Sequence, residues 1–360
     1  MTKQPPAKTL DQWLSTPVGP KRHRTFRVRL LVQAAFAATC VVIGFQLSRF
    51  YLAAKAGELP LPHRPPGAEG FLPISGLMGI LDWIYQGTLN RIHPAATILV
   101  ILALLSAILL RKSFCSWVCP VGLISESLAR LGRKLFGRNF KIWRWLDRPL
   151  QSLKYLILAF FVWAIFTMSA EALQAFIQSP YNKVADVKMG LFFVNLGQVG
   201  VTVMLVLIVG SVFIHGLWCR YLCPYGAMLG LFSWMSPVQI RRTAESCIDC
   251  SLCDEACMAR LPISKLAVVR SVECTGCVDC LAVCPVKSTL ELAAGPKRMK
   301  IPTHAAAVVL LFLLGTVAAR MTGQWHNDIS DQEYVQRFQE MNQPEYGHPG
   351  AYEPSDRAGK

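Results

Sequence analysis

Charged side chains are scarce in this chain of 360 residues. They make up 16% of the sequence, against roughly 25% in soluble domains. Nucleotide and haem motifs are also missing: there is no G-x-G-x-x-G, no P-loop and no C-x-x-C-H. His93, His215 and His304 fall at the ends of apolar runs, not in pairs within them as a membrane haem b requires. We therefore expect no haem, flavin or nucleotide cofactor.

The abundant positive charge lies beside long apolar runs. A net charge of +15 would suggest nucleic acid as the partner of a soluble protein, but this placement favours membrane lipid and no nucleic acid. A sixth apolar stretch, residues 71–90, is interrupted by proline and glycine and predicts a re-entrant or interfacial segment. Five runs approach the roughly 20 residues that cross a hydrocarbon core, namely Leu30–Ser48, Ile92–Leu110, Tyr155–Ala170, Leu191–Ile214 and Ile301–Ala319.

Lysine and arginine predict the orientation of these runs. They number seven before the first run, nine from Arg111 to Arg148 between the second and third, and ten between the fourth and fifth. The alternate connections and the tail carry few. We therefore expect a multi-pass protein of a bacterial inner membrane, with a cytoplasmic N-terminus and a periplasmic C-terminus. The length of the first run favours an uncleaved anchor over a signal peptide.

Twelve of the thirteen cysteines fall into motifs, while Cys40 lies alone in an apolar run and is interpreted as structural. Eight of them form two C-x2-C-x2-C-x3-C runs, the bacterial two-cluster ferredoxin pattern. Three thiolates from one run and the fourth from the other then ligate each [4Fe-4S] cluster. Zinc is the alternative, but eight cysteines at this spacing fit tetrahedral zinc sites poorly. The predicted ligands are Cys247, Cys250, Cys253 and Cys284 for cluster 1, and Cys274, Cys277, Cys280 and Cys257 for cluster 2.

The remaining four cysteines form two C-x3-C-P motifs, 104 residues apart. Cys115 and Cys119 belong to the first, and Cys219 and Cys223 to the second, each after an apolar run, so the chain carries an internal two-span repeat. The spacing predicts two thiols on one helical face, with proline ending or kinking the segment. Three interpretations stay open: a jointly bound metal or cluster, redox-active thiols, or a structural contact between the membrane helices and the ferredoxin segment.

A quinone is a further expected ligand, because quinone sites combine apolar walls with a few polar groups. Most of these residues also suit a membrane interface without any ligand. The candidate residues are Asp82, Trp83, Tyr85, Arg91 and His93 on the outer side, and His215, Trp218 and Tyr221 on the inner side.

The fold class predicted is mainly α: a polytopic helix bundle of about five spans with a small α+β ferredoxin domain. The segment 321–360 is too polar for a core of its own, which predicts a disordered outer tail. The alternatives are a docking strip for a partner, or a metal site at His326 and His348. The predicted parts are a cytoplasmic segment 1–25, a four-span domain 26–240, the ferredoxin domain 241–300, a fifth span 301–320 and the tail 321–360.

Two C-x3-C-P motifs at span ends, followed by a two-cluster ferredoxin segment, resemble the NapH/MauN-type membrane polyferredoxins, which are related to the cores of NosR and CcoG. The resemblance covers residues 25–300. It implies an electron-transfer subunit, such as a component of a quinol dehydrogenase, and not a stand-alone enzyme. This subunit would link the quinone pool to a periplasmic cytochrome or reductase, or to a ferredoxin. A copper reductase for cofactor assembly and a redox-sensing regulatory scaffold are the other two hypotheses.

Overall fold

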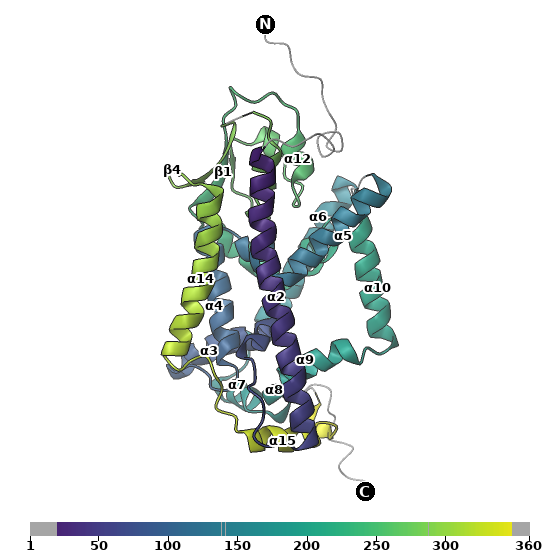
Figure 1. Ribbon diagram of the computed structural model, residues 1–360, viewed down its shortest axis with the longest axis vertical. Helices are drawn as coiled ribbons and strands as arrows, with labels where there is room; N and C mark the ends of the chain where they lie inside the picture. Colours follow the sequence, from purple (N-terminus) through teal and green to yellow (C-terminus); the bar gives the residue numbers. More distant parts are fainter. Residues whose placement is uncertain (1–19, 138, 141, 287, 348–360) are drawn as a thin grey trace. The chain divides into compact units, whose positions relative to one another are not determined.

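The computed structural model describes residues 20–137, 139–140, 142–286 and 288–347. Helices dominate this part of the chain, and the only sheet in it has four short strands (Figure 1). The longer helices are α2 (Pro20–Ala56), α3 (Pro73–Gln86), α4 (Pro94–Leu110), α5 (Pro120–Phe136), α6 (Arg144–Phe166), α9 (Ala185–Val194), α10 (Gln198–Phe213), α11 (Pro224–Ser233) and α14 (Ile301–Met321). The shorter ones are α7 (Ala170–Ile177), α8 (Pro180–Lys183), α12 (Leu252–Ala256), α13 (Asp279–Val283) and α15 (Asp331–Gln339), with helical turns η1 (Pro66–Phe71), η2 (Phe114–Val118), η3 (Trp218–Leu222), η4 (Ile263–Lys265) and η5 (Pro344–Tyr346).

All five predicted apolar runs are helical. Within the described residues, α2, α6 and α14 are long and apolar enough to cross a membrane, and α4 is a shorter apolar helix of 17 residues. The predicted run Leu191–Ile214 is not one straight span, because α9 and α10 meet at an angle of 78°. Residues 195–197 break it: Asn195 leaves the helical region of backbone space and Gly197 follows. The pair counts as a fourth span if the two helices cross together.

The chain separates into two compact units. The first, here called the ferredoxin unit, consists of Met1–Ala37, Leu102–Ala159 and Val201–Leu313. The second unit consists of Ala38–Ile101, Phe160–Gly200 and Leu314–Lys360. Both units draw on distant stretches of sequence, because the unit boundaries fall inside α2, α4, α6, α10 and α14.

A small antiparallel sheet organises the ferredoxin segment. Its strands are β1 (Val238–Arg242), β2 (Val268–Val269), β3 (Leu290–Ala294) and β4 (Lys297–Arg298), in the order β2-β1-β3-β4. Ile240 pairs with Leu292 on β3 and with Val269 on β2, and all three side chains are buried. The helices α12 and α13 pack on each other. This is the small ferredoxin domain predicted from the two cysteine runs.

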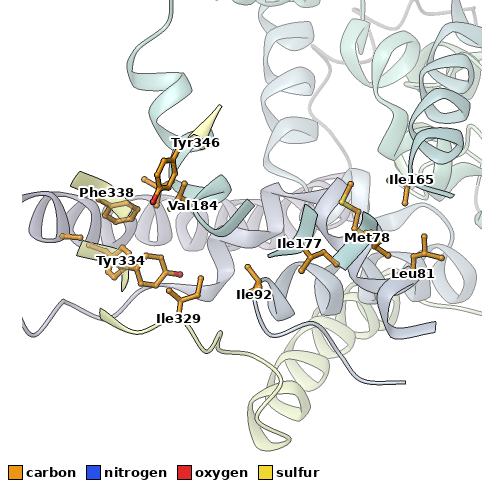
Figure 2. Close-up of a cluster of buried hydrophobic side chains, with 14 residues drawn as sticks. Met78, Leu81, Ile92, Ile165, Ile177, Val184, Ile329, Tyr334, Phe338 and Tyr346 are labelled. Carbon is orange, nitrogen blue, oxygen red and sulfur yellow. The ribbon is translucent and has the colours of Figure 1, made fainter. Parts of the chain in front are cut away.

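The described part of the predicted tail, residues 321–347, forms α15 and η5 and packs into a core, which corrects the prediction of disorder for these residues. Ser330 caps α15 by accepting a hydrogen bond from the Glu333 amide (3.3 Å). This helix then buries Tyr334 and Phe338 in the core of the second unit, where Phe50 meets both rings edge-on. Figure 2 shows the same cluster with Tyr346 beside Val184. The segment is polar in composition, but its few aromatic residues share one face and complete a core that other segments begin.

Candidate functional site

The two ferredoxin cysteine runs share an unusual backbone pattern. In the first run, the residues on either side of the second cysteine, Asp249 and Ser251, have φ values of 50° and 57°. The equivalent residues of the second run, Gly276 and Val278, have φ values of 65° and 59°. A β-branched residue such as Val278 rarely adopts this left-handed conformation, and backbone strain of this kind concentrates at ligand-binding sites. Both loops therefore curl in the same way around the space that their cysteines line.

The structure sorts the eight cysteines into two groups of four. A small pocket is lined by the side chains of Cys247, Cys250, Cys253 and Cys284. In the second group, the thiol of Cys280 lies near enough to three other thiols for their charges to interact, those of Cys257, Cys274 and Cys277. Each group takes three cysteines from one run and one from the other. These are the two sets that the spacing predicts; that each set ligates a cluster stays a prediction.

The two groups differ in burial. Cys274 and Cys280 are buried, whereas all four cysteines of the first group are partly exposed. Burial raises the pKa of Cys253 and of Cys257 to about 12. A metal-free thiol at these positions is therefore protonated at neutral pH, and binding of iron must release its proton.

The donor chemistry fits iron–sulfur clusters. Among the described residues, no three His, Cys, Asp or Glu side chains are close enough to hold a single ion. Four thiolates on one zinc ion lie roughly 3.8 Å apart, as zinc–sulfur bonds of about 2.3 Å require. A cubane is larger and holds its four thiolates farther apart, so four grouped but separated thiols suit the cubane better.

A buried cation fixes the second cysteine loop. Arg29 on α2 donates hydrogen bonds to the Cys277 carbonyl (3.3 Å) and to the Asp279 carboxylate (2.5 Å), and it also pairs with Glu126. Its side chain is only 2% exposed. Arg111 similarly donates to the Ser271 carbonyl at 2.8 Å. The sequence indicates Arg29 and Arg111 only as part of the positive charge that predicts orientation. Their contacts with a distant loop cannot be predicted, because no local pattern distinguishes them from other basic residues near an apolar run.

The two C-x3-C-P motifs adopt the same backbone, which confirms the repeat. Each begins as a π-helical turn, η2 or η3, closed by a hydrogen bond of 2.9 Å from the second cysteine amide. The second cysteines, Cys119 and Cys223, are extended and cap helices α5 and α11. The expectation of two thiols on one helical face is therefore wrong. The proline keeps the preceding residue out of the helical region and starts the next helix, since its fixed φ suits the first helical position.

These turns bring their four thiols together. The thiol of Cys115 lies near enough to those of Cys119 and Cys223 for charge interaction, and Cys119 has the same relation to Cys219. Burial raises the pKa of Cys115, Cys119 and Cys219 to about 12. Two segments 104 residues apart in sequence thus share one partly buried four-thiol site within the ferredoxin unit.

The quinone candidates fall into several environments. Of the candidates predicted for the outer side, Trp83 and Arg91 line a pocket of about 420 Å³ in the second unit, whereas Tyr85 is exposed and is not among the residues that line it. Asp82 is buried and accepts a hydrogen bond from Gln174. His93 is fully buried, with Nε2 at 2.6 Å from the Asn182 carbonyl oxygen. The sequence predicts these five residues as one group, but only Trp83 and Arg91 line the pocket.

The three candidates predicted for the inner side also lie in different environments. Tyr221 donates a hydrogen bond to Asp147 at 2.5 Å beside the Arg220–Asp147 ion pair, so its hydroxyl is already engaged. Burial lowers the pKa of His215 to about 4, which keeps its ring neutral. Trp218 begins the second π-helical turn and is partly buried.

The two tail histidines were the alternative prediction of a metal site. His326 is exposed, and its ring meets that of His63 edge-on, with the centroids 5.3 Å apart. His348 lies outside the described residues. His326 does line the pocket that holds Trp83 and Arg91, a role that the sequence did not indicate because more than 200 residues separate it from them.

Comparisons with known proteins agree with these sites. A family profile described as a 4Fe-4S binding domain matches twice, at residues 92–139 and 196–242. The two matches begin 104 residues apart and each contains one C-x3-C-P motif. The profile therefore covers the repeat, and the ferredoxin cysteines lie outside it.

Among curated proteins, YccM of Escherichia coli, named for a role in electron transport, is 44% identical over 278 residues, which cover 75% of this chain and 78% of YccM. The ferredoxin-type protein NapH of Haemophilus influenzae is 29% identical over 52% of this chain and 64% of NapH. The regulatory protein NosR of Pseudomonas aeruginosa is 29% identical over 59% of this chain and 29% of NosR. No solved structure gives a significant match. The extent of the match to YccM, together with the 4Fe-4S profile and the paired cysteine motifs, shows that this chain belongs to the NapH/NosR-type polyferredoxin family of iron–sulfur electron-transport proteins.

Proposed function

We propose that the protein is a membrane-bound electron carrier whose ferredoxin domain holds two [4Fe-4S] clusters. Cluster 1 is ligated by Cys247, Cys250, Cys253 and Cys284, and cluster 2 by Cys274, Cys277, Cys280 and Cys257. The observation that carries the proposal is the sorting of eight thiols into these two groups of four. When bound, such clusters accept and donate one electron at a time.

The surrounding residues suit this task. The partly exposed first group gives a soluble redox partner access to cluster 1, while the buried second group faces the membrane helices through Arg29 and Arg111. Hydrogen bonds and nearby charge tune the potential of a bound cluster. Arg29 holds the Cys277 carbonyl and the Asp279 carboxylate in place, so it positions this loop for cluster 2.

We further propose that the pocket of the second unit receives a quinone head group. Pro94, Ile98 and Ile101 give it apolar walls, and Arg91 and His326 supply polar groups, the combination that ligand pockets of this size use. Oxidation of a quinol releases two electrons and two protons. Because the pKa of His326 is lowered, its neutral ring is available to accept one of these protons.

The topology proposed for this function follows the lysine and arginine counts. The N-terminus and ferredoxin domain lie on the cytoplasmic side of a bacterial inner membrane, and the tail lies on the periplasmic side. The partner is a periplasmic cytochrome or reductase, or a cytoplasmic ferredoxin, in line with relatives named as ferredoxin-type and electron-transport proteins.

The test uses the full chain, purified without oxygen in detergent. EPR spectra are recorded before and after addition of a reduced quinol analogue, in wild type and in the His326→Gln and Trp83→Ala variants. We expect cluster signals to grow with quinol in wild type and more slowly in both variants, while dithionite reduces all three proteins equally. Tyr85→Phe, a change outside the pocket, is the matched control. Wild-type clusters that respond to dithionite but never to quinol would refute the quinone assignment and leave the ferredoxin assignment standing.

A further inference from the structure

The four-thiol site formed by the two C-x3-C-P turns is not used by either ferredoxin cluster. Its cysteines are Cys115, Cys119, Cys219 and Cys223, all within the ferredoxin unit, all free thiols and all partly buried. The thiols of Cys115, Cys119 and Cys219 each lie close to at least two of the other thiols. One repeat supplies only two of the four, so neither repeat can complete the site alone.

Backbone amides lie near the second thiol of each turn. The Gly226 amide donates to the Cys223 sulfur at 3.3 Å. Cys119 makes no side-chain hydrogen bond at the equivalent position, but the amides of Gly122 and Val121 act on its thiol and favour the thiolate. Cys119 and Cys223 cap the N-termini of α5 (17 residues) and α11 (10 residues), where the helix dipole stabilises negative charge. The free thiols are protonated at neutral pH, but amides and a helix N-terminus stabilise the thiolate that forms when a metal displaces the proton, so both positions suit a ligand.

Two lysines and one hydroxyl group without a hydrogen-bond partner in the described part of the chain lie beside the four thiols. The ammonium groups of Lys112 and Lys154 are close enough to act on the Cys115 thiol, and both side chains are almost fully buried. Glu273 offsets part of this charge, at 2.5 Å from Lys154 and 4.0 Å from Lys112. Ser125 Oγ lies beside the Cys219 sulfur and has no other hydrogen-bond partner in the described part of the chain. Four thiolates around a metal core carry net negative charge. Lys112 and Lys154 can stabilise that charge, and the Ser125 hydroxyl can donate a hydrogen bond to it.

The four-thiol site also touches the loops that carry cluster 2. In the first turn, Ser116 donates to the Thr275 carbonyl (2.7 Å) and Trp117 Nε1 donates to the Gly276 carbonyl (3.0 Å). Glu273, the partner of both lysines, directly precedes Cys274. In the second turn, the Arg220 charge acts on Cys257. Both turns therefore lie against ligands of cluster 2, and none of these contacts involves the first cysteine group.

We propose that Cys115, Cys119, Cys219 and Cys223 together ligate a third [4Fe-4S] cluster, shared between the two repeats, which exchanges single electrons with cluster 2. One electron leaves cluster 2 as one enters the third cluster, or the reverse, so no further oxidant or reductant is needed. The 4Fe-4S profile that matches both repeats agrees with this ligand set. The inference rests on the proposed function only in naming cluster 2 as the electron partner; the ligand set stands without it.

The decisive measurement is the iron and acid-labile sulfide content of the full chain, purified without oxygen and fully reconstituted. Three cubanes predict about 12 iron atoms per chain, and two predict about 8. The single variants Cys115→Ser and Cys219→Ser should each fall to about 8, because each removes a ligand of the same cluster. The matched control is Cys40→Ser, which lies outside every motif and should keep about 12.

The outcomes separate this inference from the proposed function. About 8 iron atoms in wild type, unchanged in Cys115→Ser, would overturn the third cluster and leave the ferredoxin assignment intact. Zinc or copper lost from Cys115→Ser in place of iron would also overturn it. In the ferredoxin variant Cys250→Ser/Cys277→Ser, we expect about 4 iron atoms to remain and to disappear when Cys115→Ser is added. Because the wild-type count alone distinguishes 8 from 12, a variant that fails to fold does not remove the test.

Discussion

Arg29 is a single cation buried between two carboxylates, and its removal should be costly. Its guanidinium pairs with Asp279 at 2.5 Å and with Glu126, and it donates to the Cys277 carbonyl. The Arg29→Met variant keeps much of the side-chain volume but leaves two acids without this partner; Glu126 still pairs with Arg130. Breaking a buried pair from one side costs about 3–5 kcal/mol. At about 2–4 °C per kcal/mol for a chain of this size class, the Tm should fall by about 6–20 °C.

The assay is thermal unfolding of the detergent-solubilised protein, followed by the loss of cluster absorbance and by EPR. The signal from cluster 2 should be lost before that of cluster 1, because Cys277 and Asp279 belong to the loop that Arg29 holds. Arg27→Met is the matched control: it removes the same charge from the same helix, at an exposed position. The triple variant that adds Glu126→Gln and Asp279→Asn should recover part of the stability. A Tm for Arg29→Met within about 2 °C of the control would refute the argument.

Three further predictions follow from the packing. Burial favours the neutral form of Glu273, but Lys112 and Lys154 outweigh burial and lower the pKa of this carboxyl group. The Tm of wild type should therefore exceed that of Glu273→Gln by a constant amount above pH 6. This difference should shrink only as the pH falls below about 4.3, the pKa of glutamate in the unfolded chain. In rapid thermal scans, a difference that grew towards low pH would contradict this. Gly122→Ala should lower the iron content, because a Cβ there would lie 2.1 Å from the Cys115 carbonyl oxygen, whereas Gly44→Ala meets nothing within 4 Å and should leave iron unchanged. Phe338→Ala should lower the free energy of unfolding by about 3–5 kcal/mol, because it leaves a cavity in the core of the second unit. We expect faster proteolysis of the tail at unchanged iron content. A loss of iron equal to that of Gly122→Ala would contradict a separate response of the two units.

Local spacing was sufficient to predict the chemistry of the ferredoxin segment. The C-x2-C-x2-C-x3-C runs give ligands within one loop, and their geometry depends on a few consecutive backbone angles. The equal spacing of the C-x3-C-P motifs predicted the repeat, and the two copies share one backbone. Apolar length predicted the helices of all five runs, three of which are long enough to cross a membrane. The bend between α9 and α10 was not predicted, because Asn195 and Gly197 stop the helix inside an otherwise apolar stretch.

The sequence by itself determined which residue types bear the chemistry: eight ferredoxin thiols, four paired thiols before proline, and long runs without charge. Only the tertiary structure decided which of them meet. The four thiols of the repeat converge although 104 residues separate the pairs, Lys154 reaches Glu273 across 119 residues, and Arg29 reaches Asp279 across 250. Tyr334 and Phe338 likewise become core residues only because Phe50 lies against them. Spacing fixes geometry over a few residues, whereas long-range contacts depend on how whole helices pack, and that information is distributed over the entire chain.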